Sequence, residues 1–329
     1  MIDRMNPLVP FARGRPTAVA ALWIVAVVTA PDFSRAVSLA EPRMVLNRSL
    51  FLQWDEAAAA SFESYEVFAS TESGFAPSAQ TRVRTIDRAG MAYGRIFDLQ
   101  PETTYYFKVR VQRTTGSETS GEVSATTRPD GVNEDRIPTV MYHHVQPRAQ
   151  FPSGYDPGGW ISTENLSRDF TYLQEHGIHP VTHWDILRRI DNGVPLPPNP
   201  VFLTFDDGFV TFYDHAMPLL LTHDFQAVNA IVTRKTGGFS DWAVPEWPLM
   251  PLMTWAQIAE CQRDGIWMGS HTQTHVDFSL EPGKAYEIPG SRDDMIAQFG
   301  FHPRYFCYPW GMGGRRIQSM LDQTAAAGY

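Results

Sequence analysis

The stretch Pro200-Val-Phe-Leu-Thr-Phe-Asp-Asp-Gly208 sets two adjacent carboxylates directly after a mainly apolar run. The run Pro200–Phe205 is short and predominantly apolar, which predicts a strand buried on both faces, as strands of parallel sheets are. On its own, Asp206-Asp207-Gly208 would predict only a turn. After so apolar a strand, however, two neighbouring carboxylates need a partner that offsets their repulsion, and a cation meets that need.

The sequence on either side of this strand alternates between helical and strand-like patterns. Leu166, Phe170 and Leu173 recur at the spacing of one helix face, and Ala227–Thr233 has the composition of a second buried strand. Such alternation predicts an α/β domain with a parallel sheet, closed into a distorted (β/α) barrel. In barrels of this type the active site lies at the carboxyl ends of the strands, which is where the Asp206-Asp207 pair falls.

Two further motifs follow, His271-Thr-Gln-Thr-His275 and Arg304-Tyr-Phe-Cys-Tyr-Pro-Trp-Gly311. A zinc ion that catalyses hydrolysis needs three protein ligands and an open position for water. Asp207, His271 and His275 can supply such a set, because histidines four residues apart share a face wherever the chain turns helically. A lone His-x3-His pair is usually incidental, so its neighbours in the sequence are what give it weight.

The three motifs, in this order, resemble those of the polysaccharide deacetylase family, also called the NodB-homology domain or carbohydrate esterase family 4. The resemblance implies that Asp206 acts as the general base on the attacking water. It also implies that Asp207, His271 and His275 hold a divalent ion. Zn²⁺ is the first expectation, and Co²⁺, Ni²⁺ and Mn²⁺ suit the same ligands.

Three more roles follow from the resemblance. Arg304 is expected to orient the base through paired hydrogen bonds, and the backbone N–H of Tyr308 to donate to the oxyanion of the tetrahedral intermediate. Most family members place their general acid, a histidine, late in the domain, and this sequence offers no such late histidine. Met141-Tyr-His-His144 instead resembles the opening strand of a circularly permuted subgroup that includes poly-N-acetylglucosamine deacetylases. His143 is therefore the expected general acid, with His144 as the alternative.

Residues 41–129 have an all-β pattern. Short β-type runs alternate with turns, and in Tyr105–Val111 every second side chain is apolar, as expected of a strand with one buried face. Leu99–Tyr105 resembles the turn that enters the sixth strand of fibronectin type III domains, where a tyrosine hydroxyl bonds back to the chain. Trp54 matches the core tryptophan of that family. We therefore expect a fibronectin type III-like β-sandwich that acts as a spacer or a glycan-docking module.

Residues 1–40 have the pattern of a signal peptide, in which a basic region precedes the apolar stretch Ala18–Ala30. Ser38-Leu39-Ala40 is the first expected cleavage site, and Val28-Thr29-Ala30 is the second. Retention of the segment as a membrane anchor is the alternative. Either outcome exports the rest of the chain, so we expect a periplasmic or secreted protein.

The polar, aperiodic residues 130–136 predict a linker between the two domains. The deacetylase domain is expected to span residues 137–329. Because Tyr329 falls within a helix-like pattern and before a further expected strand, this domain is expected to be cut short at its C-terminus.

The composition limits the classes of partner. Lys and Arg total 27 against 36 Asp and Glu, a formal net charge of -9, so no extended basic surface for nucleic acid is expected. The two cysteines, Cys261 and Cys307, are expected to be buried free thiols. The expected partner is an acetylated polysaccharide, and the mature chain is expected to have no membrane span unless the signal is retained.

These patterns together predict an exported, metal-dependent deacetylase that removes N-acetyl groups from an extracellular or cell-wall polysaccharide of the poly-N-acetylglucosamine type and releases acetate. Two alternatives stay open. The same metal site would serve an O-deacetylase, and a degenerate deacetylase domain would leave a non-catalytic glycan-binding or adhesion protein. The complete set of Asp206, Asp207, His271 and His275 favours catalysis.

Overall fold

The computed structural model describes residues 37–131, 137–151, 159–242, 248–311 and 318–329. Residues 1–36 of the expected signal peptide and residues 132–136 of the expected linker lie outside the described residues. In the parts of the chain that the structure describes, no helix is both long enough and apolar enough to cross a membrane.

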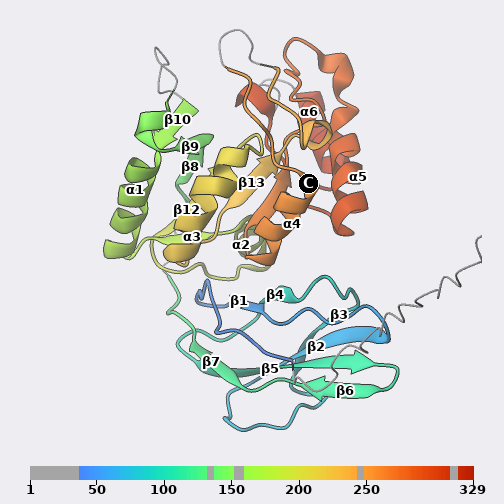
Figure 1. The fold of residues 1–329 in the computed structure, drawn as a ribbon. Coiled ribbons are helices and arrows are strands. Elements are labelled where there is room, and N and C mark those ends of the chain that lie inside the picture. Colours follow the sequence, from blue (N-terminus) through green and yellow to red (C-terminus); the bar gives the residue numbers. More distant parts are fainter. Residues whose placement is uncertain (1–36, 132–136, 152–158, 243–247, 312–317) are drawn as a thin grey trace, which may run out of the picture. The chain divides into compact units, whose positions relative to one another are not determined.

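Residues 37–131 form an all-β sandwich, drawn in blue to green in Figure 1. Its strands are β1 (Leu50–Gln53), β2 (Phe62–Ser70), β3 (Arg82–Ile86), β4 (Tyr93–Ile96), β5 (Thr104–Arg113), β6 (Gly116–Thr119) and β7 (Val123–Thr126). β1 pairs with β4, and the second sheet has the order β3-β2-β5-β6, with β7 also paired to β5. All these pairings are antiparallel, and the sandwich predicted from the sequence is confirmed.

The core of the sandwich follows the alternation predicted in β5. The fully buried side chains of this strand are Phe107, Val109 and Val111. Trp54 and Tyr65 meet edge to face in the same core, with ring centroids 5.4 Å apart. Tyr105 Oη accepts a hydrogen bond from the backbone N–H of Gln100 at 3.0 Å. This bond is the tyrosine corner that the sequence predicted.

The first described residues already belong to the sandwich. Leu39 forms an antiparallel bridge with Trp54. The backbone N–H of Asp55 donates to the carbonyl of Ser38 at 3.0 Å, and the Ser38 N–H donates to the Asp55 carboxylate at 3.0 Å. The side chains of Val37 and Leu39 are buried in the sandwich core. The sandwich therefore begins before residue 41, where cleavage at the first expected site would start the mature chain.

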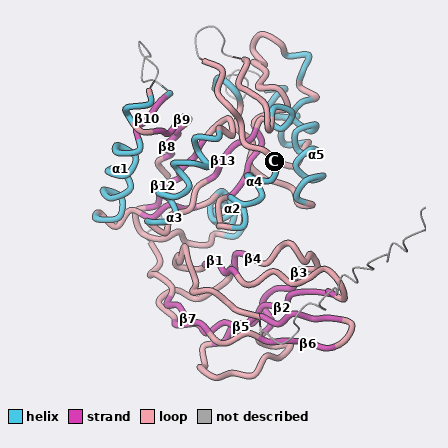
Figure 2. Tube along the Cα trace, in the orientation of Figure 1, coloured by secondary structure: helices cyan, strands magenta, loops and turns pink. Residues whose placement is uncertain are grey.

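Strands and helices alternate from residue 137 onward, as Figure 2 shows in magenta and cyan. The strands are β8 (Thr139–Tyr142), β9 (His144–Gln146), β10 (Trp160–Ser162), β11 (His179–Val181), β12 (Pro200–Phe205), β13 (Val228–Ile231) and β14 (Trp267–Ser270). The α-helices are α1 (Thr163–Glu175), α2 (His183–Asn192), α3 (Met217–Thr222), α4 (Trp255–Arg263), α5 (Glu287–Phe299) and α6 (Gln318–Ala326). Shorter helical turns lie at Arg148–Gln150, Phe212–Ala216, Thr233–Lys235, Pro282–Lys284 and Pro309–Gly311.

One parallel sheet organises this domain. β12 pairs with β11 along its first half and with β8 and β13 along its second half, and β14 pairs with β13. Ser270 forms a further parallel bridge with Phe306, so the chain around Phe306 runs in the direction of the strands. β8, β12 and β13 lie between α1 on one side and α5 on the other (Figure 1). The parallel α/β architecture predicted from the sequence is confirmed.

The apolar patterns that predicted these elements face one core. Every residue of β12 is buried, as expected of a strand covered on both faces. Leu166 and Phe170 of α1 are fully buried against the same core, and Leu173 packs at its margin. The carboxyl ends of β8, β12 and β14 are thereby fixed at one edge of the sheet.

A chain that begins at Glu41 lacks the buried side chains of Val37 and Leu39, and we expect it to be less stable than a chain that begins at Pro31. Full burial of one such side chain contributes about 1.5 to 3 kcal/mol, so the free energy of unfolding should fall by about 3 kcal/mol or more. Thermal unfolding of both versions, followed by circular dichroism, measures the difference. Equal stability would show that these residues add nothing to the sandwich.

Candidate metal centre

Three side chains converge at the carboxyl ends of β12 and β14. Asp207 follows β12, and His271 and His275 follow β14. The Nε2 atoms of His271 and His275 lie 3.3 and 3.1 Å from Oδ1 of Asp207. One ligand atom of each residue lies within 4.8 Å of the other two, and all three residues are buried. The set fits a divalent ion such as Zn²⁺, which takes nitrogen and oxygen ligands.

An unusual backbone conformation turns Asp207 out of the strand. Asp207 has a φ of +78° and Gly208 has a φ of +79°. A Cβ at Gly208 would lie 3.1 Å from Cδ1 of Ile231, so glycine suits this position for space as well as for conformation. At Asp207, a residue with a side chain, the left-handed conformation costs about 1–3 kcal/mol and persists where the surrounding contacts hold it.

A backbone carbonyl orients His271. Its Nδ1 lies 2.9 Å from the carbonyl oxygen of Cys307, and because a carbonyl only accepts hydrogen bonds, Nδ1 carries the hydrogen. In the neutral ring, Nε2 then has the free lone pair, and this atom faces Asp207. Contacts of this kind commonly fix the tautomer and direction of a histidine that binds metal.

The electrostatic surroundings favour the metal-binding protonation state at Asp207 and His275, but they favour a protonated ring at His271. Burial alone would raise the pKa of Asp207, but hydrogen bonds from the two imidazoles bring it below its ordinary value. Burial lowers the pKa of His275, although Asp207 opposes the shift. Burial also disfavours a charge on His271, yet its interactions with Cys307 and Asp207 hold its pKa well above the ordinary value. An ionised carboxylate and a neutral His275 are the forms in which these residues coordinate a metal ion.

The segment between the two histidines is a tight turn, in contrast to the helical turn that their spacing suggested. Thr272 and His275 have φ values of +67° and +65°, which no helix contains. Oγ1 of Thr272 accepts hydrogen bonds from the backbone N–H groups of His275 at 2.9 Å and Val276 at 3.3 Å. The threonine hydroxyl thus closes a turn that aims both imidazoles at Asp207.

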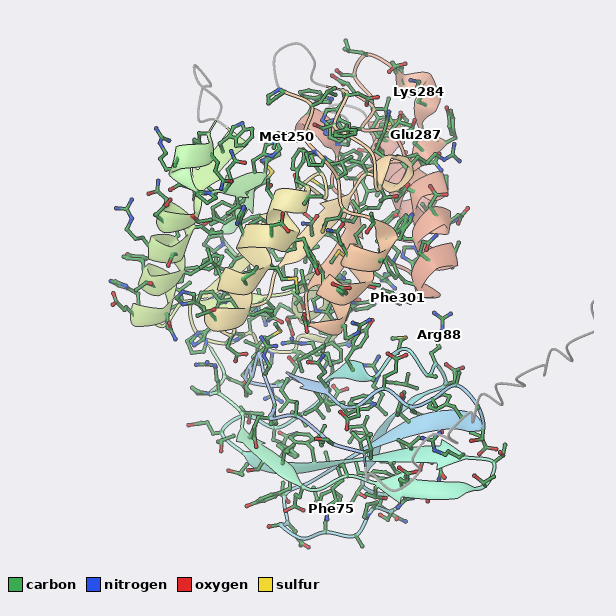
Figure 3. All side chains as sticks on the ribbon, viewed as in Figure 1. Phe75, Arg88, Met250, Lys284, Glu287 and Phe301 are labelled. Carbon is green, nitrogen blue, oxygen red and sulfur yellow. The ribbon has the colours of Figure 1, made fainter. Side chains whose placement is uncertain are left out.

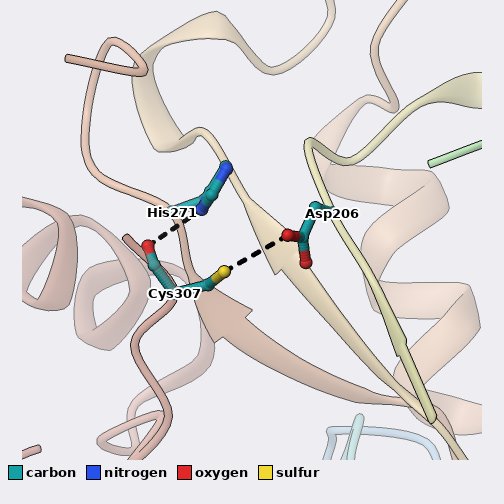
Figure 4. Close-up of side chains that lie close together, drawn as sticks. All are labelled: Asp206, His271 and Cys307. Atoms are coloured by element: carbon teal, nitrogen blue, oxygen red, sulfur yellow. Dashed lines mark hydrogen bonds between the residues drawn. The ribbon is translucent and has the colours of Figure 1, made fainter. Parts of the chain in front are cut away.

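Asp206 lies beside the ligand set and contacts a cysteine (Figure 4). Its side chain is buried, and Oδ2 lies 3.2 Å from Sγ of Cys307. Burial raises the pKa of the Cys307 thiol, so the S–H donates to the carboxylate. Asp206, His271 and Cys307 also bring one ligand atom each within 4.8 Å. Because a thiol that keeps its proton is a poor ligand, the set with Asp207 and His275 is favoured.

Arg304, the expected partner of the base, does not meet Asp206. Its side chain is exposed, and its guanidinium lies 5.9 Å from the ring of Trp184. Phe306 bridges Ser270 at the end of β14, so Arg304 comes two residues before the carboxyl edge of the sheet. Cys307, which the sequence indicated only as a buried thiol, occupies the place beside the base. The sequence offers no local signal for this, because Arg304 has a φ of +56° and only Phe306 is bridged to the sheet, so the two-residue period of a strand does not extend over positions 304–307.

The two candidate acids have different surroundings. His143 is half-buried between β8 and β9, close enough to His275 for its charge to contribute to the lowered pKa of that ring. His144 is fully buried in β9, and its ring lies 4.1 Å from that of Trp160 and 3.6 Å from that of Phe209. Burial lowers the pKa of His144 to about 3, so its imidazole is neutral near pH 7.

The side chain of Tyr308 packs into a cluster of its own. Its hydroxyl bonds with that of Thr324 in α6, and its ring meets those of Phe278 and Phe306 edge-on. This packing holds the backbone that follows Cys307. The role expected for Tyr308 uses only its backbone N–H, and that role stays a prediction.

Two tryptophan side chains flank His275. Trp242 stacks on the imidazole, with ring centroids 4.4 Å apart and planes 17° apart. Trp310 meets the same ring edge-on at 5.1 Å and is 49% exposed. The imidazole of His275 is thereby held between two indole rings, and the ring of Trp310 is also exposed to solvent.

Part of this chain is similar to known polysaccharide deacetylases. The model of the polysaccharide deacetylase family matches residues 193–329, which contain β12, β14 and all three motifs. The poly-beta-1,6-N-acetyl-D-glucosamine N-deacetylase of Escherichia coli K12 is 33% identical over 181 residues, which make up 49% of this chain. The match spans 25% of the length of that relative.

Two solved structures align with part of this chain. A de-N-acetylase from Aggregatibacter actinomycetemcomitans aligns with a TM-score of 0.50 and 22% identity, over 59% of this chain and 85% of that chain. IcaB from Ammonifex degensii aligns with a TM-score of 0.48 and 24% identity, over 59% of this chain and 81% of that chain. The first of these likenesses supports the fold alone. Residues 193–329 of this chain thus match the polysaccharide deacetylase family, and the three motifs lie within that match.

Proposed function

We propose that this protein is a metal-dependent deacetylase that hydrolyses N-acetyl groups of a polysaccharide of the poly-N-acetylglucosamine type and releases acetate. The observation that carries the proposal is a buried Asp207, His271 and His275 set with Asp206 directly beside it, inside the region of the family match. The name of the curated E. coli relative supports N-deacetylation and this class of substrate.

The chain's own residues suit the steps of amide hydrolysis. A divalent ion held by Asp207, His271 and His275 would polarise the acetyl carbonyl and make a water molecule more acidic. Asp206 is the proposed general base: the Cys307 S–H holds its Oδ2, while Oδ1 is buried and has no hydrogen-bond partner among the described residues. That oxygen is available to take the proton of the attacking water.

The later steps need an oxyanion donor and an acid. The backbone N–H of Tyr308 is the proposed donor to the tetrahedral intermediate. When the carbon–nitrogen bond breaks, the leaving amine takes a proton, and His143 is the proposed source. The half-buried position of His143 near His275 supports this role, whereas the stacked, neutral ring of His144 does not suit it.

The ion and the location belong to the proposal as well. Zn²⁺ is the proposed ion because one oxygen and two imidazole nitrogens suit it, and Co²⁺ suits the same donors. Export to the periplasm or beyond is supported by the signal-like sequence of residues 1–40 and by the proposed polymeric substrate.

Acetate release from N-acetylglucosamine oligomers should stop when EDTA removes the metal and return when Zn²⁺ or Co²⁺ is restored. Asp207→Asn should lose zinc, as metal analysis would show, because the variant lacks the anionic ligand. No acetate from folded, zinc-loaded protein would contradict the proposal and favour a glycan-binding protein. Release from O-acetylated substrates alone would favour the O-deacetylase.

Asp206→Asn should lower kcat by about 100-fold or more, the usual cost of losing a general base. Zinc content should be unchanged, because Asp206 is not one of the proposed ligands. Steady-state kinetics and metal analysis of the same preparation separate the two effects. Loss of zinc together with activity would instead make Asp206 a ligand.

His143→Asn should lower kcat by about 100-fold at unchanged zinc content, because the leaving amine loses its proton source. His144→Phe is the matched control, since phenylalanine keeps an aromatic ring beside those of Trp160 and Phe209 and His144 is already neutral. Its kcat should change little. A larger loss in the His144 variant than in the His143 variant would reverse the assignment.

Cys307→Ala should lower kcat by about 3- to 10-fold, the effect of one lost hydrogen bond of ordinary strength on the barrier. Cys307→Ser keeps a donor and should retain most of the activity. Cys261→Ala is the control, because Cys261 is buried on α4, and its kcat should equal that of the wild type. Equal losses in the serine and alanine variants would argue against a hydrogen-bonding role for Cys307.

A further inference from the structure

The turn that joins the two histidine ligands is held in a conformation that its residues rarely adopt. Thr272 and His275 have positive φ values, and neither is glycine. Such conformations persist only where surrounding contacts hold them. The Thr272 hydroxyl holds the end of the turn through His275 and Val276, while the middle, Gln273 and Thr274, is held by another element.

That element is α5, through its first residue, Glu287. Oε2 of Glu287 accepts hydrogen bonds from the backbone N–H groups of Gln273 at 3.1 Å and Thr274 at 2.9 Å. Oε1 accepts a hydrogen bond from the hydroxyl of Thr274 at 2.7 Å. The residue is 2% exposed, and Figure 3 labels it at the start of α5, beside Lys284. Hydrogen bonds to a carboxylate are stronger than those between neutral groups, so this contact restrains the turn firmly.

The same face of α5 contacts the end of β14 and the turn over two helical turns. It carries Glu287, Gly290, Ser291 and Asp294, at the spacing of one helix face. A Cβ at Gly290 would lie 2.7 Å from the side chain of Gln273, so glycine permits the close approach. The Ser270 hydroxyl donates to that of Ser291 at 2.5 Å, and Asp294 accepts a hydrogen bond from the Gln273 side chain at 2.9 Å.

We propose that Glu287 is a positioning residue for the metal centre. By fixing Gln273 and Thr274, it keeps His271 and His275 in the arrangement that brings both Nε2 atoms to Asp207. This role rests on the proposed metal site and adds to it a buried carboxylate that contacts neither the ion nor the substrate.

If Glu287 positions the histidines, it affects metal affinity, whereas a residue that only supports the fold would not. Without Glu287 the turn is free to leave the left-handed conformations at Thr272 and His275, so the two imidazoles must be ordered again each time an ion binds. Metal affinity should therefore depend on Glu287. Groups that orient metal ligands from outside the coordination shell commonly change affinity by about 10- to 100-fold.

The test is the zinc affinity of Glu287→Gln in the full exported chain, measured by competition with a chromogenic chelator. Glutamine has the same size but offers one acceptor oxygen and no charge, so at least one of the three hydrogen bonds to the turn is lost or weakened. We expect zinc to dissociate about 10- to 100-fold more readily than from the wild type. The visible absorption of the Co²⁺-loaded protein should also change, because it reports the geometry of the ligands.

Asp294→Asn is the matched control. Asp294 lies on the same face of α5 and contacts the side chain of Gln273 and the hydroxyl of Thr233, but not the backbone of the turn. Its loss should lower thermal stability with little change in zinc affinity. Thr274→Val is the second variant: it removes only the hydroxyl that donates to Glu287 and should weaken zinc binding less than Glu287→Gln does.

The outcomes separate this role from the proposed function. Unchanged zinc affinity and an unchanged Co²⁺ spectrum in folded Glu287→Gln would overturn the role, as would an equal loss of affinity in Asp294→Asn. If Glu287→Gln does not fold, unchanged affinity in Thr274→Val overturns it. Wild-type protein that binds no zinc overturns both the metal centre and the role. Wild-type protein that binds zinc without releasing acetate contradicts only the deacetylase proposal.

Discussion

The site depends on two adjacent carboxylates that are buried at the end of β12. Burying charge is costly unless hydrogen-bonding or oppositely charged partners surround it. Here two imidazoles face Asp207 and a thiol faces Asp206, so each carboxylate has partners of its own. Those partners come from two other segments that end at the same edge of the sheet. The parallel sheet is thus what makes the burial of this pair tolerable.

The sequence predicted best those elements that are buried either along their whole length or on alternate residues. β12 is buried along its whole length, and β5 is buried on alternate residues, and both patterns are visible directly in the amino-acid sequence. The three proposed metal ligands were also predicted correctly as neighbours, because parallel strands end at a common edge. The tyrosine corner at Tyr105 was predicted because it depends on a short local segment.

The predictions failed where the direction of a side chain depended on more than spacing. The spacing of His271 and His275 predicted both rings on one face if the chain turned helically, but Thr272 has a positive φ that its own hydroxyl and the distant Glu287 support together. No residue such as glycine marks this turn in the sequence. Arg304 was expected beside Asp206 from a resemblance alone. The register of Phe306 with Ser270 places Cys307 there instead, and that register becomes known only when the pairing is seen.

Cys307 contacts both His271, a proposed metal ligand, and Asp206, the proposed general base, and it uses a different group for each contact. Its carbonyl accepts the hydrogen of His271 Nδ1, and its thiol donates to Asp206. Because both groups belong to one residue, the distance from its carbonyl oxygen to His271 and the distance from its sulfur to Asp206 cannot change independently. An engineer who replaces the side chain at this position removes the thiol that contacts the base but keeps the carbonyl that orients His271. An insertion or a shift near Phe306 would displace the contacts to His271 and to Asp206 together. Redesign of the surrounding loops therefore has to keep the pairing of Phe306 with Ser270.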